Sequence, residues 1–452
     1  MKTNTQFLIN DCQLELYRFP RQASHSALQA WDAADEYLLN HLYENEDLNT
    51  LVSANIAIIN DEFGALGCAL SAINSKVKDA NQINQPLANI YTFSDSFMSH
   101  QALKQNLAHN LKHNFKHNFK HNHLDAVQAY DVLTLSESSS DKFSEQVSDK
   151  KLPDCFDYVL IKIPRTLALL EQELISLSQY ISEDTKIIAA AKVKLVSTNV
   201  LKLFERYIGP TRTSLAVKKA RLVFCCADEK TFKIAVEHPP SLYPTIVTDP
   251  ALDFDLYNHA NVFCREQLDI GARLMLETFR NEIRSKDKSN EKQNRINALD
   301  LGCGNGVLGI AYLRENPNAT MTFVDESFMA VASARLSFEH AFSEQTQKPG
   351  VNFMVSHCLQ TLSDELSQHP SQQIAKEMDL ILCNPPFHQQ NVITTDIAWQ
   401  MFLDARKHLK KGGELRVVAN RHLPYFEKLK RLFGNCSLLA NNRKFVVLSC
   451  IR

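Results

Sequence analysis

Short apolar runs alternate with amphipathic segments of helix length along the chain, and they form two successive series. The runs of the first series span 56–59, 90–93, 158–163, 187–191 and 222–226, and those of the second span 298–301, 321–324, 380–383, 415–419 and 445–449. Brief, nearly continuous apolar runs are typical of buried strands, and the longer segments between them indicate helical crossovers. Each series therefore predicts an α/β domain built on a largely parallel sheet.

Local sequence also recurs in the same order in both series. Gly64-Ala-Leu-Gly67 matches Gly306-Val-Leu-Gly309, the segment around Asp95 matches the one around Asp325, and 157–164 matches 379–386. Two interpretations are open: an ancient duplication of one doubly wound domain, or chance resemblance between two α/β domains. We expect tandem Rossmann-like domains at 1–235 and 259–452, with the proline-rich segment 236–258 as a linker.

A glycine-rich turn follows the first run of the second series. Asp300 lies at the end of this run, and Gly302-Cys303-Gly304-Asn305-Gly306 leads into a helix-length segment. Glycine permits positive φ and close approach of the backbone to a ligand, and the free N–H groups at a helix start can bind a carboxylate. The dinucleotide fingerprint has its third glycine one residue later, where this chain has Val307, so the spacing points away from NAD.

Asp325 closes the next apolar run. A carboxylate at this place can accept both ribose hydroxyls of a nucleoside, and hydrogen bonds to such a charged group contribute about 1.5 to 3 kcal/mol. The alternative is that Asp325 caps the following helix, which Glu326-Ser327 would permit.

Asn384-Pro385-Pro386-Phe387 follows the buried run 380–383, so it emerges at the carboxyl edge of the predicted sheet, where open α/β folds bind ligands. The Asn384 amide oxygen and the Pro385 carbonyl can each accept one hydrogen of a planar amine, while the prolines stiffen the backbone. Phe387 can stack on the ring that bears the amine, which contributes about 1 to 3 kcal/mol. A simple proline turn is the alternative, but the three elements in order favour an amine-binding corner.

The first copy lacks this chemistry. Asn60-Asp61-Glu62-Phe63-Gly64 keeps one glycine of the turn, and Lys162-Ile163-Pro164-Arg165 has neither the amide nor the stacking aromatic residue. We therefore predict a degenerate N-terminal domain that recognises substrate or supports the second copy. Its candidate phosphate contacts are Lys192, Lys194, Lys218, Lys219 and Arg221.

Composition narrows the possible function classes. The net charge of −2 excludes a protein that coats nucleic acid through bulk charge, so RNA binding needs a local basic patch. Candidate patches, which can equally be solvated helix faces, are Arg406, Lys407, Lys410 and Lys411, and Lys428, Lys430 and Arg431. The 11 cysteines form no Cys-x-x-Cys pair, which argues against a disulfide framework and a zinc site and favours a cytoplasmic protein. No apolar stretch reaches the roughly 18 residues of a membrane span.

Two segments look like insertions. Residues 111–123 repeat Lys-His-Asn-Phe, so His113, His117 and His121 would share a helix face. A metal site is conceivable there, but low-complexity insertion is favoured, and we predict no metal site. The polar segment 136–151 is predicted to be a flexible loop.

Across these motifs the second copy resembles class I S-adenosylmethionine-dependent methyltransferases. The whole chain is similar to the RlmG family of large-subunit ribosomal RNA guanine-N2 methyltransferases, which is close to RsmC of the small subunit. The segments that carry the likeness are 28–39, 166–171, 259–263, 268–273, 324–327, 384–390, 420–423 and 433–436.

The resemblance implies S-adenosylmethionine as cofactor and methylation of one guanine N2 in 23S ribosomal RNA, before the RNA assembles with proteins. It also implies that the first copy helps to grip RNA, and it does not imply an obligate protein partner. Because no apolar stretch is long enough, we expect no membrane insertion. The cofactor residues it implies, together with those of the glycine turn, are Phe263, Asp269, Gly271, Asp300, Gly302, Gly304, Asn305, Gly306 and Asp325. For Phe263 and 269–271, packing before the first strand is the alternative.

The expected reaction is direct in-line methyl transfer, promoted by positioning in a dry pocket rather than by a strong base. Because a duplex hides the Watson–Crick edge, the target guanine must be unpaired or extruded. Two alternatives are open. One is a protein glutamine amide as acceptor, although a tyrosine usually replaces Phe387 in such enzymes, and the other is a non-catalytic RNA-binding assembly factor.

Overall fold

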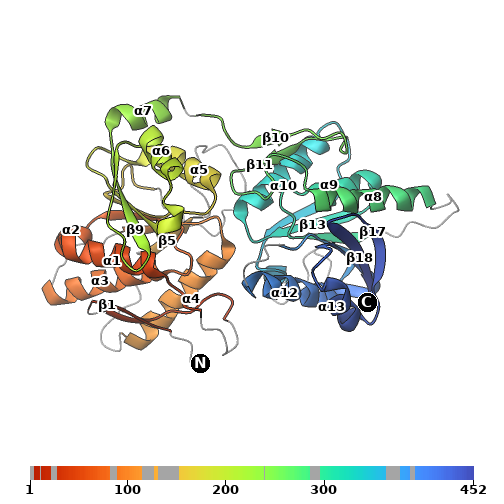
Figure 1. The fold of residues 1–452 in the computed structure, drawn as a ribbon, viewed down its shortest axis with the longest axis horizontal. Helices are drawn as coiled ribbons and strands as arrows, with labels where there is room; N and C mark the ends of the chain where they lie inside the picture. Colours follow the sequence, from red (N-terminus) through yellow and green to blue (C-terminus); the bar gives the residue numbers. More distant parts are fainter. Residues whose placement is uncertain are drawn as a thin grey trace. The chain divides into compact units, whose positions relative to one another are not determined.

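The computed structural model describes residues 5–10, 12–21, 28–81, 89–114, 127–130, 152–238, 240–285, 296–362, 377–386 and 392–452. The chain divides into two compact units, Met1–Leu242 and Tyr243–Arg452, and each contains one seven-stranded sheet (Figure 1). The histidine repeat beyond residue 114 and the segment 136–151 lie outside the described residues.

The first unit begins with a two-stranded hairpin, and its large sheet has the order β5-β4-β3-β6-β7-β9-β8. Its elements are β1 (Gln6–Ile9), β2 (Cys12–Glu15), α1 (Ala33–Asn45), α2 (Leu48–Leu51), β3 (Asn55–Ile59), α3 (Ala65–Asn81), β4 (Asn89–Phe93), α4 (Phe97–Asn114), β5 (Val127–Tyr130), β6 (Tyr158–Lys162), α5 (Leu167–Leu177), β7 (Lys186–Lys192), α6 (Thr198–Tyr207), β8 (Thr211–Thr213), β9 (Ala220–Cys226) and α7 (Glu229–Glu237), with 3-10 turns at Ser178–Tyr180 and Val193–Leu195.

The second unit also begins with a short hairpin, and its large sheet has the order β14-β13-β12-β15-β16-β18-β17. Its elements are β10 (Thr245–Val247), β11 (Leu256–Asn258), α8 (Ile270–Ser285), β12 (Asn297–Leu301), α9 (Val307–Glu315), β13 (Thr320–Asp325), α10 (Phe328–Ala341), β14 (Gly350–Val355), β15 (Met378–Cys383), α12 (Val392–His408), β16 (Leu409–Asn420), α13 (Tyr425–Phe433), β17 (Ser437–Asn441) and β18 (Phe445–Ile451).

The two sheets have the same topology. In each, the strand order counted within the sheet is 3-2-1-4-5-7-6, the first five strands are parallel, and the seventh strand pairs antiparallel with both the fifth and the sixth. Nine of the ten predicted apolar runs fall within a strand of these sheets, and the tenth, 158–163, extends one residue beyond β6. The predicted α/β fold with two tandem Rossmann-like units is therefore confirmed.

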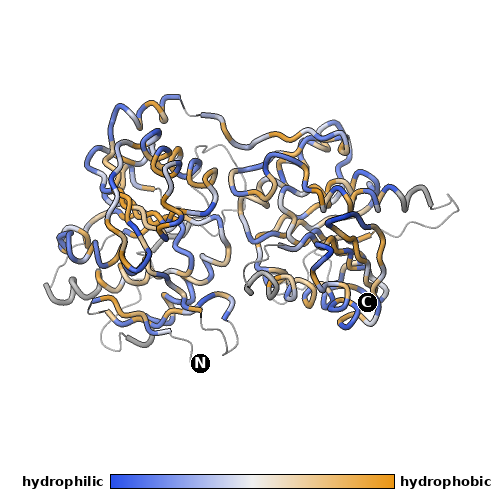
Figure 2. Tube along the Cα trace, viewed as in Figure 1, coloured by the Kyte–Doolittle hydropathy of each residue, from blue (hydrophilic) through white to orange (hydrophobic). Residues whose placement is uncertain are grey.

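Each sheet lies between two helical layers. Helices α1, α3 and α4 share one core with the first sheet, and α5, α6 and α7 share the core on its other face (Figure 1). In the second unit α8, α9 and α10 cover one face, and α12 and α13 cover the other. Because both faces are buried, the central strands are continuously apolar, as Figure 2 shows for each unit.

The segment 236–258, expected to be a linker, contributes to the core of the second unit over most of its length. β10 and β11 pair as an antiparallel hairpin, and Val247, Phe254 and Leu256 are buried in that core. Along the chain, the boundary between the two compact units falls between Leu242 and Tyr243, and α7 of the first unit ends at Glu237. The turn-forming residues of this segment therefore connect short strands.

Strand register gives a residue-by-residue correspondence between the two sheets. Ile59 pairs with Phe93 and Ile161, and Leu301 pairs with Val324 and Cys383. The residues that follow these strands therefore correspond as well: Asn60 with Gly302, Ser94 with Asp325, and Lys162 with Asn384. The local sequence match had aligned Asp95 with Asp325, one position away from the correspondence that the sheets show.

Candidate active site

The predicted site residues of the second unit follow neighbouring parallel strands at one edge of the sheet. Asp325 ends β13, the glycine turn follows β12, and Asn384 follows β15. Since β12 lies between β13 and β15, the turn is flanked by Asp325 on one side and Asn384 on the other. This arrangement is the one expected for a ligand held at the carboxyl edge of an open α/β sheet.

The glycine turn adopts a backbone that other residues rarely adopt. Gly302, Gly304 and Gly306 have φ of 74°, 53° and 80°. A Cβ at Gly306 would lie 2.9 Å from Cβ of Ala334 in α10, so this glycine is needed for close packing of α9 against α10. A Cβ at Gly304 would meet nothing within 4 Å, so the turn leaves open space where a ligand can approach the backbone.

Asp325 is tied to this turn. Its carboxylate accepts the N–H of Gly304 at 2.9 Å and that of Ser327 at 3.1 Å. Burial raises the pKa of Asp325, and the two backbone N–H groups oppose that rise because they stabilise the charged form. Ser327 is the N-cap of α10 and accepts from Ala330, so a helix cap does not account for Asp325.

Asp300 and Asn305 make hydrogen bonds that connect the glycine turn to α9 and to β11. Asp300 is fully buried, accepts the Gly309 N–H through Oδ2 at 2.9 Å, and has no partner for Oδ1 among the described residues. Burial raises its pKa to about 8. Asn305 donates to Oδ1 of buried Asn258 at 2.8 Å, so its side chain connects the turn to β11. The pattern of apolar runs gave no signal for Asn258, because it ends the three-residue strand β11, which is too short to show a period.

Asn384 is held in one orientation. Its Nδ2 donates to Oδ2 of Asp269 at 3.2 Å, whereas its Oδ1 is buried and has no partner among the described residues. Pro385 is buried, Pro386 is exposed, and Phe387 lies outside the described residues. The Asn384 amide oxygen is therefore available to accept a hydrogen from a ligand.

The segment before α8 lies against this corner. Asp269 caps α8 by accepting the Ala272 N–H at 2.8 Å, and a Cβ at Gly271 would come within 3.0 Å of the Asp269 carboxylate. Phe263 is 56% exposed. Asp269 and Gly271 thus lie beside Asn384, where the family pattern placed the border of the cofactor pocket, and Phe263 offers an exposed ring on the same segment.

These residues fit S-adenosylmethionine. The space beside Gly304 leaves room for a ligand against the backbone, Asp325 presents a carboxylate beside it, and Oδ1 of Asn384 has no hydrogen-bond partner among the described residues. The described residues contain no group of three or more His, Cys, Asp or Glu side chains placed to hold a metal ion. In the same part of the chain, no helix is both long enough and apolar enough to span a bilayer.

The first unit has a different set of contacts at the corresponding corner. Lys162, which corresponds to Asn384, is buried and pairs with Asp35 at 2.6 Å and with Asp32 at 2.9 Å. Asp32 is the N-cap of α1, as Asp269 is of α8. Asparagine and serine stand where the second unit has Gly302 and Asp325. A buried ion pair thus replaces the asparagine–aspartate bond, and a serine stands at the place of the Asp325 carboxylate.

Two of the candidate phosphate contacts of the first unit have partners. Lys218 pairs with Glu36 at 2.7 Å, and Lys192 lies 3.5 Å from Asp32. In the second unit, Lys410 of the candidate patch 406–411 pairs with Asp379 at 2.9 Å. Because of these ion pairs, fewer of the candidate basic side chains are free to bind RNA phosphates than the sequence suggests.

Comparisons with known proteins agree with this geometry. Residues 4–229 match the RLMG N-terminal domain, and residues 253–449 match the methyltransferase small domain. A ribosomal RNA large subunit methyltransferase G of Yersinia enterocolitica is 41% identical over 449 residues, covering 99% of this chain and 94% of that protein. Its namesake in Erwinia tasmaniensis is 39% identical over 448 residues, covering 99% of both chains.

A solved structure shares the whole fold. It is that of the T. thermophilus 16S rRNA N2 G1207 methyltransferase RsmC in complex with AdoMet and guanosine, with a TM-score of 0.64 at 15% identity, covering 99% of this chain and 97% of that one. Such low identity establishes the architecture alone, whereas the sequence relatives match at about 40% across nearly the full length. The chain belongs to the ribosomal RNA large subunit methyltransferase G family.

Proposed function

We propose that the second unit transfers the methyl group of S-adenosylmethionine to the exocyclic N2 of one guanine in 23S ribosomal RNA. The bound cofactor supplies an electrophilic methyl group. The observation that carries the proposal is the Asn384 oxygen, which is buried, unpartnered among the described residues and adjacent to the glycine turn. Membership in the methyltransferase G family, with relatives about 40% identical, supports RNA as the acceptor.

The chain itself contributes positioning. The open space at Gly304 would admit the methionyl end of the cofactor, and Asp325 would accept the ribose hydroxyls. Asn384 Oδ1 and the Pro385 carbonyl each accept one N2 hydrogen, which orients the nitrogen toward the methyl group. Because the N2 lone pair is delocalised into the ring, this orientation would provide most of the catalysis. As the new N–C bond forms, the bond between the methyl group and sulfur would break, the thioether S-adenosylhomocysteine would leave, and the N2 proton would then pass to water.

The first unit is proposed to help grip the RNA. Its corner is occupied by the Lys162 ion pairs, so it is not expected to bind the cofactor. The accepted RNA is protein-free 23S RNA with the target guanine unpaired or extruded, since a duplex hides the N2 edge. We further propose that the enzyme acts in the cytoplasm without an obligate protein partner.

The test uses full-length protein and S-adenosylmethionine with a labelled methyl group. The acceptors are protein-free 23S RNA, assembled large subunits and a protein extract, and digested products are analysed for N2-methylguanosine and methylglutamine. We expect N2-methylguanosine from protein-free RNA, and turnover reduced roughly 10²-fold or more for Asn384→Ala with similar cofactor affinity. Label on glutamine, or wild-type turnover by Asn384→Ala, would overturn the proposal, and cofactor binding without transfer would indicate an assembly factor.

A further inference from the structure

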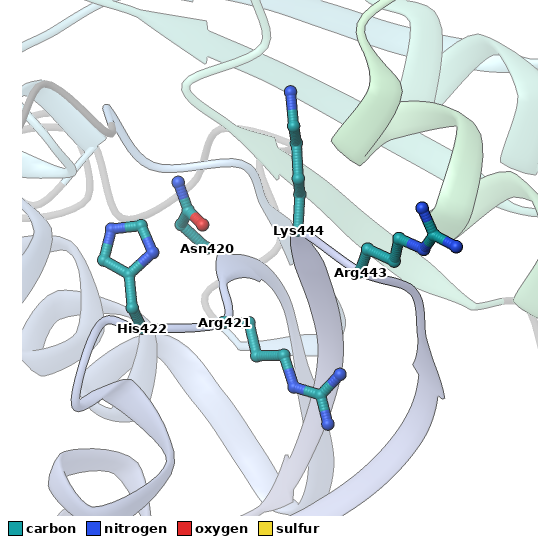
Figure 3. Close-up of a pocket in the computed structure, with 5 residues that line it drawn as sticks. All are labelled: Asn420, Arg421, His422, Arg443 and Lys444. Atoms are coloured by element: carbon teal, nitrogen blue, oxygen red, sulfur yellow. The ribbon is translucent and has the colours of Figure 1, made fainter.

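A basic pocket lies beside the proposed acceptor site, at the ends of β16 and β18. Its volume is about 570 Å³, and it is lined by Asn420, Arg421, His422, Arg443 and Lys444. In Figure 3 the side chains of Asn420, His422 and Lys444 extend in the same direction, whereas Arg421 extends the opposite way and Arg443 to the side. The three cationic side chains Arg421, Arg443 and Lys444 form no ion pair among the described residues.

The backbone of the pocket is well fixed. Oδ1 of Asn442 accepts the N–H groups of Lys444 and Phe445 at 2.9 and 2.8 Å, which fixes the turn between β17 and β18. The Arg421 N–H donates to the Lys444 carbonyl at 2.8 Å and joins the loop after β16 to that turn. Cationic side chains thus extend from a backbone that does not depend on them.

The pocket continues the row of site elements along the sheet edge. Neighbouring strands carry Asp325 at β13, the glycine turn at β12, Asn384 at β15, and the pocket at β16 and β18. Cys383 pairs with Val417, and Asn420 follows three residues later. From strand spacing and rise, the Asn384 and Asn420 Cα atoms lie about 8 Å apart.

Contacts connect the pocket to the acceptor corner. Asn420 pairs with Phe445, and a Cβ at Gly271 would lie 3.2 Å from Val418 and 3.4 Å from Phe445. Gly271 follows Asp269, the residue that holds Asn384. Positive charge is therefore placed next to the acceptor, on the side away from the glycine turn and Asp325.

We propose that this pocket binds a backbone phosphate of the RNA next to the target guanine, with Lys444 and Arg443 as the main contacts. This inference rests on the proposed function. The pocket lining contains no aromatic side chain other than the His422 imidazole among the described residues, so it is suited to a phosphate rather than to a stacked base. Phosphate contacts position the strand without reading its sequence, which is what an extruded guanine requires.

The experiment compares Arg443→Ala/Lys444→Ala with Arg280→Ala/Lys348→Ala in the full chain. Both double variants remove two positive charges from the second unit. Arg280 is an exposed residue of α8, Lys348 is exposed just before β14 begins, and neither belongs to a candidate basic patch. We measure methyl transfer to protein-free 23S RNA, RNA affinity over a series of salt concentrations, and S-adenosylmethionine affinity by calorimetry.

The pocket variant is expected to raise KM for RNA about tenfold or more with little change in kcat. It should lower the slope of log affinity against log salt by about 0.7 for each phosphate that the protein no longer neutralises. The control variant should keep both values, and cofactor affinity should be equal in all three proteins. Unchanged RNA KM and salt slope would overturn the inference, and so would a loss confined to cofactor affinity, which would assign the pocket to the cofactor.

Failure of the proposed function gives a different result, because the wild type would then transfer no methyl group to RNA at all. Arg443→Glu/Lys444→Glu serves as a second variant, and its expected effect on KM and on salt slope is larger because charge is reversed. Normal cofactor affinity in either variant demonstrates that the second unit is folded.

Discussion

Asn384 donates from Nδ2 to Oδ2 of Asp269 across 3.2 Å, although the two residues are 115 positions apart in the sequence. The bond fixes which end of the Asn384 amide faces the ligand space, because the nitrogen is engaged, whereas the oxygen has no partner in the described part of the chain. Asp269 is itself fixed, since it caps α8 through the Ala272 N–H. The orientation of the acceptor-binding oxygen thus depends on the start of a helix from a distant part of the chain.

Removal of the Asp269 side chain should therefore lower turnover. Asp269→Ala frees the Asn384 amide to rotate and removes a helix cap worth about 1 kcal/mol. We expect kcat to fall about tenfold or more, because misorientation of a reacting group is costly. Asp269→Asn keeps an oxygen that accepts from both donors, so its kcat should stay close to that of the wild type. Equal losses in the two variants would contradict a positioning role for the amide bond.

The glycine turn offers a matched pair of substitutions. Gly304→Ala adds a methyl group where nothing lies within 4 Å, whereas Gly306→Ala brings one to 2.9 Å from Ala334. Both residues have positive φ, so both variants are strained by about 1 kcal/mol. We expect Gly304→Ala to weaken S-adenosylmethionine binding with a modest loss of thermal stability, and Gly306→Ala to lose much more stability. Calorimetry and thermal melting measure the two effects, and the reverse ranking would show that the cofactor is not held at Gly304.

Asp325→Asn tests the ribose contact. The amide can still accept the Gly304 N–H but loses the charge that strengthens bonds to ribose hydroxyls, worth about 1.5 to 3 kcal/mol. Affinity for S-adenosylmethionine should fall by one to two orders of magnitude. Glu326→Gln removes the same charge one residue later and should leave the affinity nearly unchanged. A similar small change in both variants would remove Asp325 from the cofactor site.

The central strands could be predicted from the sequence because both faces of each sheet are covered, which makes those strands continuously apolar. The edge strands could not. β17 is exposed over most of its length, β14 contains a polar asparagine, and the three-residue strands β8, β10 and β11 are too short to show a period. A strand that is buried on one face only, or on neither, does not show the continuous apolar run by which the central strands were predicted.

The candidate site, too, could be predicted only in part. Glycine, acidic and Asn-Pro-Pro motifs could be found because their chemistry lies in consecutive residues. The bonds that orient them could not. The family resemblance implied Asp269 as a cofactor-pocket residue but not its bond to Asn384, and the partner of Asn305, Asn258, was missed, because only the folded chain creates these contacts. The turn residues Arg443 and Lys444 carry charge at a hairpin end, and only strand order places them beside Asn384.

Asp300 should make the stability of the second unit depend on pH. Burial raises its pKa to about 8, whereas an unfolded aspartate titrates near about 3.9. Between these values the folded state holds one more proton, so stability falls as pH rises and levels off above about pH 8. Asp300→Asn does not titrate, and its stability relative to the wild type should increase by up to about 1.4 kcal/mol per pH unit between pH 6 and 8.

Urea unfolding of cofactor-free protein measures this effect. The chain has two tryptophans, Trp31 in the first unit and Trp399 in the second, so a Trp31→Phe background makes fluorescence report on the second unit alone. A difference between Asp300→Asn and its parent that stays constant from pH 6 to 8 would show that Asp300 is ionised in the folded state.

Lys162 of the first unit should be a structural rather than a functional residue. Lys162→Met leaves the carboxylates of Asp32 and Asp35 without their shared cation in a buried place, and loss of one partner of a buried ion pair costs about 3 to 5 kcal/mol. Lys218→Met serves as the control. It breaks an exposed ion pair with Glu36, which lies in α1 next to Asp35, and should cost at most about 1 kcal/mol of stability. The double variant Lys162→Met/Asp35→Leu should recover much of the lost stability, because it removes most of the uncompensated charge. Unfolding of the first unit can be followed by Trp31 fluorescence in a Trp399→Phe background.

The affinity for S-adenosylmethionine should be the same in all of these variants, because Lys162 stabilises only the fold of the first unit. Loss of cofactor affinity on substitution of Lys162 would instead show that the first unit takes part in cofactor binding.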